Sequence, residues 1–161
     1  MTITTVQQLD MQGILKMIAV ALSLPDDLVI DAANSIDISH YQECMTVLAL
    51  SQTEIGSQIT YDSDNEVEII HSVNELVLSV NAYGSRAFQL ISQLISSMSL
   101  SFMKQWQRQL KIGFLRSSAI NTLSTEKPQQ VQVELIFSIS NIFKADVYIG
   151  ESVQIITEVN K

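Results

Sequence analysis

The stretch NELVLSVNAYGSRAFQLISQL, residues 74–94, changes its hydrophobic period at Gly84. Up to Tyr83, apolar and polar residues alternate, which is typical of a strand with one buried face. After Gly84, apolar residues recur every three to four positions, which is typical of an amphipathic helix. We therefore predict a strand-to-helix corner, in which Gly84 adopts backbone angles that other residues avoid. Ser85 is predicted to cap the helix by accepting a bond from a backbone N–H group.

The sequence on both sides of this corner contains further helix and strand patterns. A polar loop is predicted from Glu54 to Asn65, because Gly56 and the run Asp62–Asn65 are turn signals. A bend or bulge is predicted at Ser140–Asn141, between two alternating segments. In chain order the predicted elements are a helix at 7–23, strands at 44–52 and 67–83, the helix after Gly84, a short helix through Met103, Trp106 and Leu110, an extended segment around Gly113, and strands at 130–140 and 143–157.

This order of elements predicts the fold class. Strands that are neighbours in sequence and joined by short loops favour a mainly antiparallel sheet, with helices packed on one face. The fold class is therefore α+β. A chain of 161 residues has the length of a single domain, here 1–161, with the N-terminal helix at about 7–23 and the sheet and central helix at about 40–157.

The composition shows more apolar residues than one small domain needs. Apolar residues make up 47% of the chain and charged residues 16%, whereas roughly a quarter of residues are charged in ordinary soluble domains. No apolar run approaches the length of about 18 residues that a membrane helix needs, and residues 1–20 lack the pattern of a signal peptide. Burial against other subunits is the expected destination of the surplus. The net charge of −8 argues against a general grip on nucleic acid.

The residues that could carry chemistry do not form a recognisable motif. His40 and His71 have no partners at metal-ligand spacing, and the single Cys44 is expected to be a packed thiol. Nucleophile elbow, phosphate loop and zinc-protease motifs are missing from the sequence. We expect no catalytic site, no cofactor and no metal. An enzyme with an unrecognised site remains an alternative, and it would use His71, Glu68 and Asp62.

The ordered segments resemble the phage neck terminator proteins, a family of head–tail joining and tail-completion proteins related in architecture to tail terminators. The resemblance covers residues of about 40 to 157. Its features are a strand followed by Ile55-Gly56, the aromatic-glycine pair Tyr83-Gly84, and the motif ELIF from Glu134 to Phe137 in the first of two closing strands. One departure is NIFKADVYIG, 141–150, where the family more often has an Arg-rich turn and an aromatic-rich strand. The segments that carry the resemblance are MTVLALSQTEIGSQITYDSDNEVEIIHSVNELVLSVNAYGSRAFQLISQL (45–94), IGFLRSSAINTLS (112–124), QVQVELIFSIS (130–140) and FKADVYIGESVQIIT (143–157).

The resemblance implies a structural protein of the virion and no catalysis. It implies a ring, typically of six copies, at the junction between the phage tail and the head connector. The implied partners are further copies of the chain, the tail tube protein and the head–tail connector protein. Genomic DNA would pass through the lumen without specific binding, and no membrane would be involved. The implied location is the neck or tail of the virion, after assembly in the host cytoplasm.

The expected contact surfaces are the predicted polar loop and the short helix around Trp106. Two alternatives stay open, namely a tail-tube-like or other ring-forming structural protein, and a generic oligomeric binding module. The candidate contact residues are Glu54, Ile55, Ser57, Gln58, Tyr61, Asp62, Asp64 and Trp106.

Overall fold

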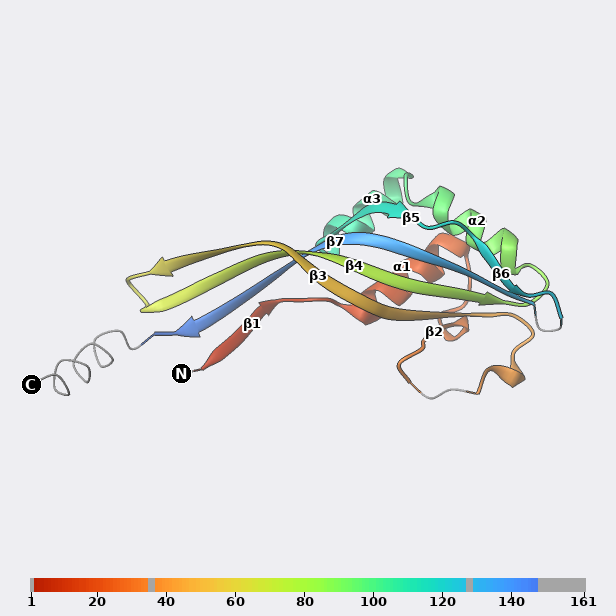
Figure 1. Cartoon of the computed structure of the whole chain (residues 1–161), viewed down its shortest axis with the longest axis horizontal. Coiled ribbons are helices and arrows are strands. Elements are labelled where there is room, and N and C mark those ends of the chain that lie inside the picture. Colours follow the sequence, from red (N-terminus) through yellow and green to blue (C-terminus); the bar gives the residue numbers. More distant parts are fainter. Residues whose placement is uncertain (1, 35–36, 127–128, 148–161) are drawn as a thin grey trace, which may run out of the picture.

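The computed structural model describes residues 2–34, 37–126 and 129–147, and Figure 1 shows how its elements are arranged. Two short 3-10 helices, η1 and η2, precede the first long strand. The elements in chain order are β1 (Ile3–Gln7), α1 (Met11–Leu22), η1 (Asp26–Leu28), β2 (Val29–Asp31), η2 (Ile38–His40), β3 (Cys44–Asp62), β4 (Val67–Tyr83), α2 (Ala87–Ser97), α3 (Ser101–Gln109), β5 (Ile112–Ser117), β6 (Asn121–Ser124) and β7 (Gln130–Asp146).

The strands form one sheet in the order β1-β7-β4-β3-β2. Strands β5 and β6 also pair with β7, and they lie along the same edge of β7 as β1, at successive positions. Every pairing is antiparallel except the short one between β2 and β3. The predicted α+β class with a mainly antiparallel sheet is confirmed.

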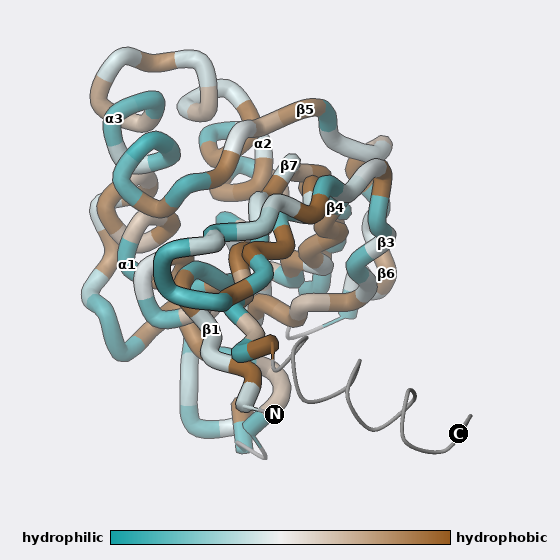
Figure 2. Tube along the Cα trace, turned by 90° about the vertical axis from the view of Figure 1, so that its left-hand side faces the viewer, coloured by the Kyte–Doolittle hydropathy of each residue, from teal (hydrophilic) through white to brown (hydrophobic). Residues whose placement is uncertain are grey.

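The three α-helices lie on one side of the sheet (Figure 2) and cover only half of its length (Figure 1). This helix-covered half is called the body. Its core forms where the apolar stripes of α1 and α2 meet the alternating apolar side chains of β4 and β7. Fully burying one such aliphatic side chain stabilises the fold by about 1.5–3 kcal/mol. The core includes Ile14, Met17 and Ile18 of α1, Leu90, Ile91 and Leu94 of α2, Leu76, Leu78 and Val80 of β4, and Val131, Val133, Leu135 and Phe137 of β7.

The strand-to-helix corner depends on the backbone of Gly84. Its φ is +121°, a conformation that L-residues with a side chain rarely adopt. A Cβ atom there would also lie 2.7 Å from the backbone oxygen of Gln42. The corner is held to the preceding loop by Arg86, whose guanidinium donates to both carboxylate oxygens of Glu43, at 2.6 and 3.2 Å.

The predicted cap at Ser85 is wrong. The N-cap residue of α2 is Arg86, and no side-chain hydrogen bond caps this helix. A backbone hydrogen bond closes the turn before the helix instead. In it, the Ala87 N–H donates to the Gly84 carbonyl at 3.2 Å. The N-cap of the helix therefore lies one residue later than the sequence pattern predicted.

The predicted N-terminal helix begins later than expected. It spans Met11–Leu22, and Asp10 caps it by accepting a bond from the Gly13 N–H at 3.0 Å. The preceding residues form β1, which the sequence analysis did not predict. The segment ITTVQ does not alternate strictly between apolar and polar residues, and its strand conformation depends on pairing with β7.

Two predicted boundaries between strands are also wrong. The predicted loop from Glu54 to Asn65 is strand as far as Asp62, and only residues 63–66 form the turn. The predicted bend at Ser140–Asn141 is not there, because β7 runs without interruption from Gln130 to Asp146. The predicted separate strand at 143–157 therefore begins as the end of β7, and its residues from 148 onward lie outside the described residues.

Replacing Gly84 tests the corner. Gly84→Ala should lower the free energy of unfolding by about 1–3 kcal/mol, because a side chain makes this φ unfavourable and collides with the 42–43 backbone. Chemical denaturation followed by circular dichroism measures the change. The control Ser85→Ala should stay within about 0.5 kcal/mol of the parent, since Ser85 does not cap the helix. An equal loss from both variants would contradict this account.

Candidate functional site: a projecting arm

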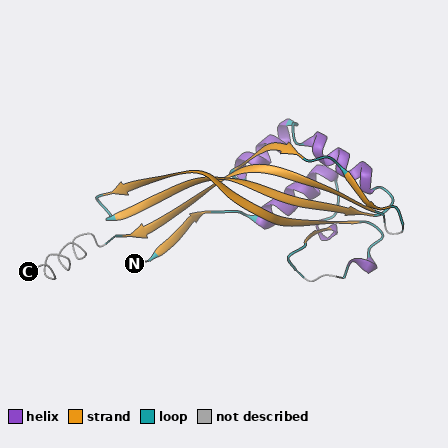
Figure 3. Cartoon of the chain, viewed as in Figure 1, coloured by secondary structure: helices purple, strands orange, loops and turns teal. Residues whose placement is uncertain are grey.

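The other half of the sheet projects beyond the helices as an arm (Figures 1 and 3). The arm consists of four strand segments, namely residues 3–7 of β1, 50–62 of β3, 67–75 of β4 and 140–146 of β7. Figure 3 shows the helices over the body and none over the arm, within the described part of the chain. The side chains of the arm therefore lack the cover that completes the core of the body.

Apolar side chains of the arm remain exposed to solvent. Ile55 and Ile59 of β3 are 62% and 64% exposed, and Ile3 of β1 is 62% exposed. Exposed apolar side chains that gather on one part of a protein mark an interaction surface more often than scattered ones do. The exposed large apolar residues of the arm are Ile3, Val6, Leu50, Ile55, Ile59, Tyr61 and Val73.

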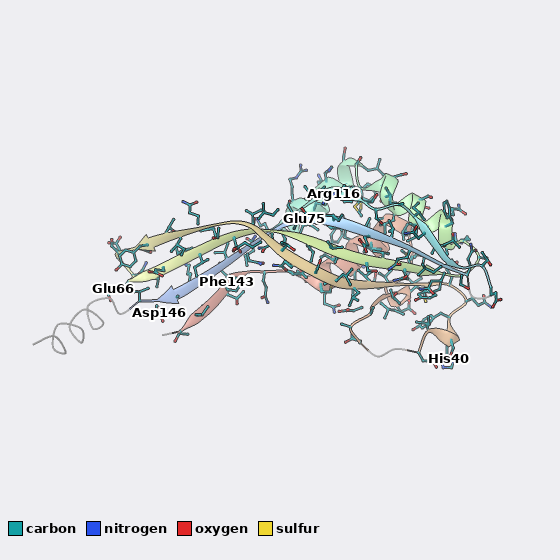
Figure 4. The ribbon with its side chains drawn as sticks, in the orientation of Figure 1. His40, Glu66, Glu75, Arg116, Phe143 and Asp146 are labelled. Atoms are coloured by element: carbon teal, nitrogen blue, oxygen red, sulfur yellow. The ribbon has the colours of Figure 1, made fainter. Side chains whose placement is uncertain are left out.

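The pairing register decides which arm side chains share a face. Phe143, Ile70 and Ile59 are partners across β7, β4 and β3, so they form an apolar row on one face. This face is continuous with the helix-covered face of the body, because Phe143 has the same parity along β7 as the core residue Phe137. Figure 4 shows Phe143 in the arm.

Two irregularities in β3 change the direction of apolar side chains. The register with β4 shifts between Ala49 and Ser51, and again between Glu54 and Gly56. The extra residues are Leu50 and Ile55, and both are more than half exposed. β-Bulges of this kind bend a strand and re-aim side chains, so they present these two residues away from the regular rows.

The tip of the arm is a turn held together by Asp62. Its carboxylate accepts hydrogen bonds from the Asn65 side-chain amide at 2.8 Å and from the Asp64 N–H at 3.1 Å. These bonds favour the charged form, so the Asn65 side chain first, and the backbone N–H groups with it, hold the pKa of Asp62 below its usual value. Glu66 closes the turn with a φ of +52°.

A polar cluster lies where the arm meets the body. Ser72 and Asn74 of β4 and Asn141 of β7 are buried on the face that carries the core. The Asn74 amide donates to the Ser72 hydroxyl at 3.1 Å, while the Asn141 Oδ1 atom has no hydrogen-bond partner among the described residues. On the opposite face, Arg116 of β5 reaches Glu75 of β4 at 2.6 Å (Figure 4). The hydrophobic core therefore ends at this level of the sheet.

The structure places most of the predicted contact residues together. Glu54, Ile55, Ser57, Gln58, Tyr61 and Asp62 lie on the β3 segment of the arm, and Asp64 lies in the tip turn. Trp106 is elsewhere, because it lies on α3 and packs half-buried against the core of the body. The predicted contact residues did not include Ile3, Val6, Leu50, Ile59, Val73 and Phe143. Of these residues, only Val73 of β4 and Phe143 of β7 lie in segments where the sequence shows alternation of apolar and polar residues.

The residues named for an unrecognised enzyme are not brought together. Glu68 pairs with Tyr61 and Ala145, whereas His71 pairs with Gln58 and Ile142, so the two side chains lie on opposite faces of the arm. His40 is on η2, far from the arm, where it lies 3.5 Å from Asp37 (Figure 4). Over the described ranges, no three His, Cys, Asp or Glu residues are grouped so that they could hold a metal ion.

The helices in the described part of the chain are all too short or too polar to cross a membrane. Cys44 is buried at the start of β3, and this burial raises the pKa of its thiol, which disfavours the reactive thiolate.

A body with a complete core and an arm with exposed apolar side chains is typical of a structural protein that assembles with other proteins. The chain belongs to the phage neck terminator proteins, since the model of the family described as phage neck terminator protein matches residues 12–160. It is therefore a structural component of the virion, and it interacts with other head or tail proteins of the phage. No curated protein matches the sequence.

Titration of Asp62 tests the tip turn. Because the folded-state pKa of Asp62 is lowered, its stabilisation of the turn is present above the usual carboxyl pKa of about 3.9 and is lost as the pH falls. Asn65→Ala should move the pKa of Asp62 upward, towards its usual value, as measured by carboxyl-carbon NMR. The control Ser63→Ala should leave it unchanged. An unaltered pKa in Asn65→Ala would show that Asn65 does not hold the carboxylate.

Proposed function

We propose that this protein closes into a ring of six copies, in keeping with its resemblance to tail terminators, at the neck end of the phage tail. The ring ends the tail tube and joins it to the head–tail connector. The observation that carries the proposal is the arm, whose apolar side chains are exposed although the body already has a complete core.

Exposed apolar side chains of the arm are the surface through which copies of the chain meet. Exposed apolar residues occur on three of the four strands of the arm, and burying them removes unfavourable contact with water. Seventeen acidic residues against nine basic ones would make copies of the chain repel each other in general. The arm strand segment from Leu50 to Tyr61 carries a single charge, at Glu54, so this edge strand is where copies can meet with little repulsion.

The action of the ring follows from its shape. One side of the ring caps the last ring of tail tube subunits, which stops further polymerisation, and the other side docks onto the connector. When the heterologous contacts between copies close into a ring, no free side remains to which a further copy could add. DNA passes through the lumen without specific binding, since a protein of net charge −8 offers little of the counterion release that holds DNA. Assembly takes place in the host cytoplasm before the protein becomes part of the virion.

The oligomeric state distinguishes this function from its alternatives. Size-exclusion chromatography with light scattering should show a closed ring of defined mass, either for the protein alone or on mixing with tail tubes. Electron microscopy of the mixture should show the ring at one end of each tube. Open polymers of variable length would indicate a tube-like protein instead. A dimer that ignores tail tubes would indicate a generic binding module, and a monomer under all conditions would overturn the proposal.

Substitutions on the arm should weaken the ring and leave the fold intact. Ile55→Ser with Ile59→Ser removes two side chains that are more than half exposed in the single chain, so the unfolding free energy should change by less than about 1 kcal/mol. Loss of about 1.4 kcal/mol per contact raises the concentration needed for assembly tenfold. Light scattering across a dilution series measures this shift.

The matched control is Leu100→Ser, which changes a side chain that is 50% exposed on the body, between α2 and α3. It should leave the assembly midpoint unchanged. An arm variant that assembles as readily as the parent would show that the apolar residues of the arm are not the contact between copies.

A further inference from the structure

The arm has two open edges. β2 pairs with β3 only at Met45–Val47, so the edge of β3 from Leu48 to Asp62 has no strand beside it in the described part of the chain. β1 forms the opposite edge, because it pairs with β7 on one side and lies at the end of the strand order. Both edges present backbone N–H and C=O groups that can pair with another strand.

Neither edge carries the Lys or Pro residues that often protect a sheet edge against pairing. Monomeric sheet proteins shield edges with Lys, Pro, short strands, inward-pointing charges or bulges. The β3 edge from Leu48 to Asp62 contains no Lys, Arg or Pro, and both of its bulges lie before Gly56. β1, with the sequence ITTVQ, contains no charge and no proline. The regular part of the β3 edge is therefore 56–62, which has the charge of Asp62 only at its end.

The two open edges lie at the same level along the arm. Following the pairing from strand to strand, Ile3 is in line with Ala145, Glu68 and Tyr61. In the same way, Thr4 is in line with Lys144, Ile69 and Thr60. A second copy placed beside the first in the same orientation thus brings β1 next to residues 56–62 with little displacement along the strands.

The strand directions fit this placement. β1 is antiparallel to β7, β7 to β4, and β4 to β3, so β1 and β3 of one chain run in opposite directions. Copies that stand side by side in the same orientation would therefore join β3 and β1 as an antiparallel pair. The arm sheet would continue from copy to copy without a change in its pattern.

We propose that β1 of one copy pairs with β3 of the next copy, opposite residues 56–62, so that the arms form one continuous antiparallel sheet. The inference rests on the proposed ring and names the contact that closes it. Main-chain hydrogen bonds hold the two strands together, as in other cases of strand addition. The contact brings Ile3 of one copy to the level of Tyr61 of its neighbour, and it places no like charges opposite each other along 56–61.

A different pairing is possible and has a different result. Two β3 edges can pair with each other about a two-fold axis, which gives a closed dimer and leaves both β1 edges open. Pairing of β3 with β1 is heterologous, so it uses both edges of every copy. A ring favours the pairing of β3 with β1, because each copy then has one neighbour on each side.

Engineered disulfides test the contact in the full-length protein. The background is Cys44→Ala, which removes the only native thiol. Thr4→Cys is combined in one chain with Gln58→Cys, Thr60→Cys or Asp62→Cys, three positions on the same face of the arm that cover the possible registers. Opposite residues on antiparallel strands have Cβ atoms about 4.5–5.5 Å apart, which allows a disulfide after small adjustment. Mild oxidation and non-reducing gel electrophoresis show the products.

The expected product is a ladder of covalent oligomers up to the size of the ring, for at least one of the three pairs. Thr4→Cys alone and Thr60→Cys alone should stay monomeric on the gel, and a mixture of the two should give a covalent dimer. The matched control combines Thr4→Cys with Thr122→Cys, another exposed threonine, on β6 of the body, and should give no ladder.

Two outcomes would overturn the inference and leave the proposed function standing. One is a covalent dimer from Thr60→Cys alone, which would show β3 pairing with β3. The other is a ring by light scattering in which none of the three pairs cross-links. A protein that forms no ring, with or without tail tubes, would overturn the proposed function, and the inference with it.

Discussion

The pairing of β4 with β7 is the constraint on which the rest of the structure depends. It joins Val67–Tyr83 to Gln130–Asp146 over the full length of both strands, with no register shift. The pairings of β1, β5 and β6 with β7 each contain one shift, and the pairing of β3 with β4 contains two. A slip of one residue would turn every core side chain of a strand to the other face, so the packing of the body fixes the register. The same register then fixes which side chains share a face in the arm.

The two strands have different surroundings at their two ends. In the body, Leu78 and Leu135 are paired beneath the helices and fully buried. In the arm, Ile70 and Phe143 are paired on the same face of the sheet, and no helices lie above this part of the face. The polar cluster that includes Asn141 marks the change, because the hydrophobic core of the body ends there. The β4–β7 pairing is thus continuous from the packed core of the body to the exposed surface of the arm, which another protein can cover.

Several features follow from the sequence alone, for local reasons. The change of period at Gly84 places the corner, and the strand predicted at 67–83 has the same bounds as β4. Strict alternation or a helical stripe is informative there because one face of the element is buried and the other is not. The family follows as well, because the order of these segments resembles the phage neck terminator proteins, and the match to residues 12–160 confirms it. Excess apolar residues predicted burial between subunits, which stays a prediction.

Only the tertiary structure decided that an arm exists. The segment 54–62 has turn-forming glycine and polar residues, and it is a strand because its backbone pairs with β4. β1 has no clear pattern, and it is a strand because β7 offers an edge beside it. Local patterns report the contrast between a buried and an exposed face, and the arm has almost no such contrast along its two edge strands, β1 and β3, in a single chain. Its conformation therefore depends on hydrogen bonds between residues far apart in the sequence, which no local pattern records.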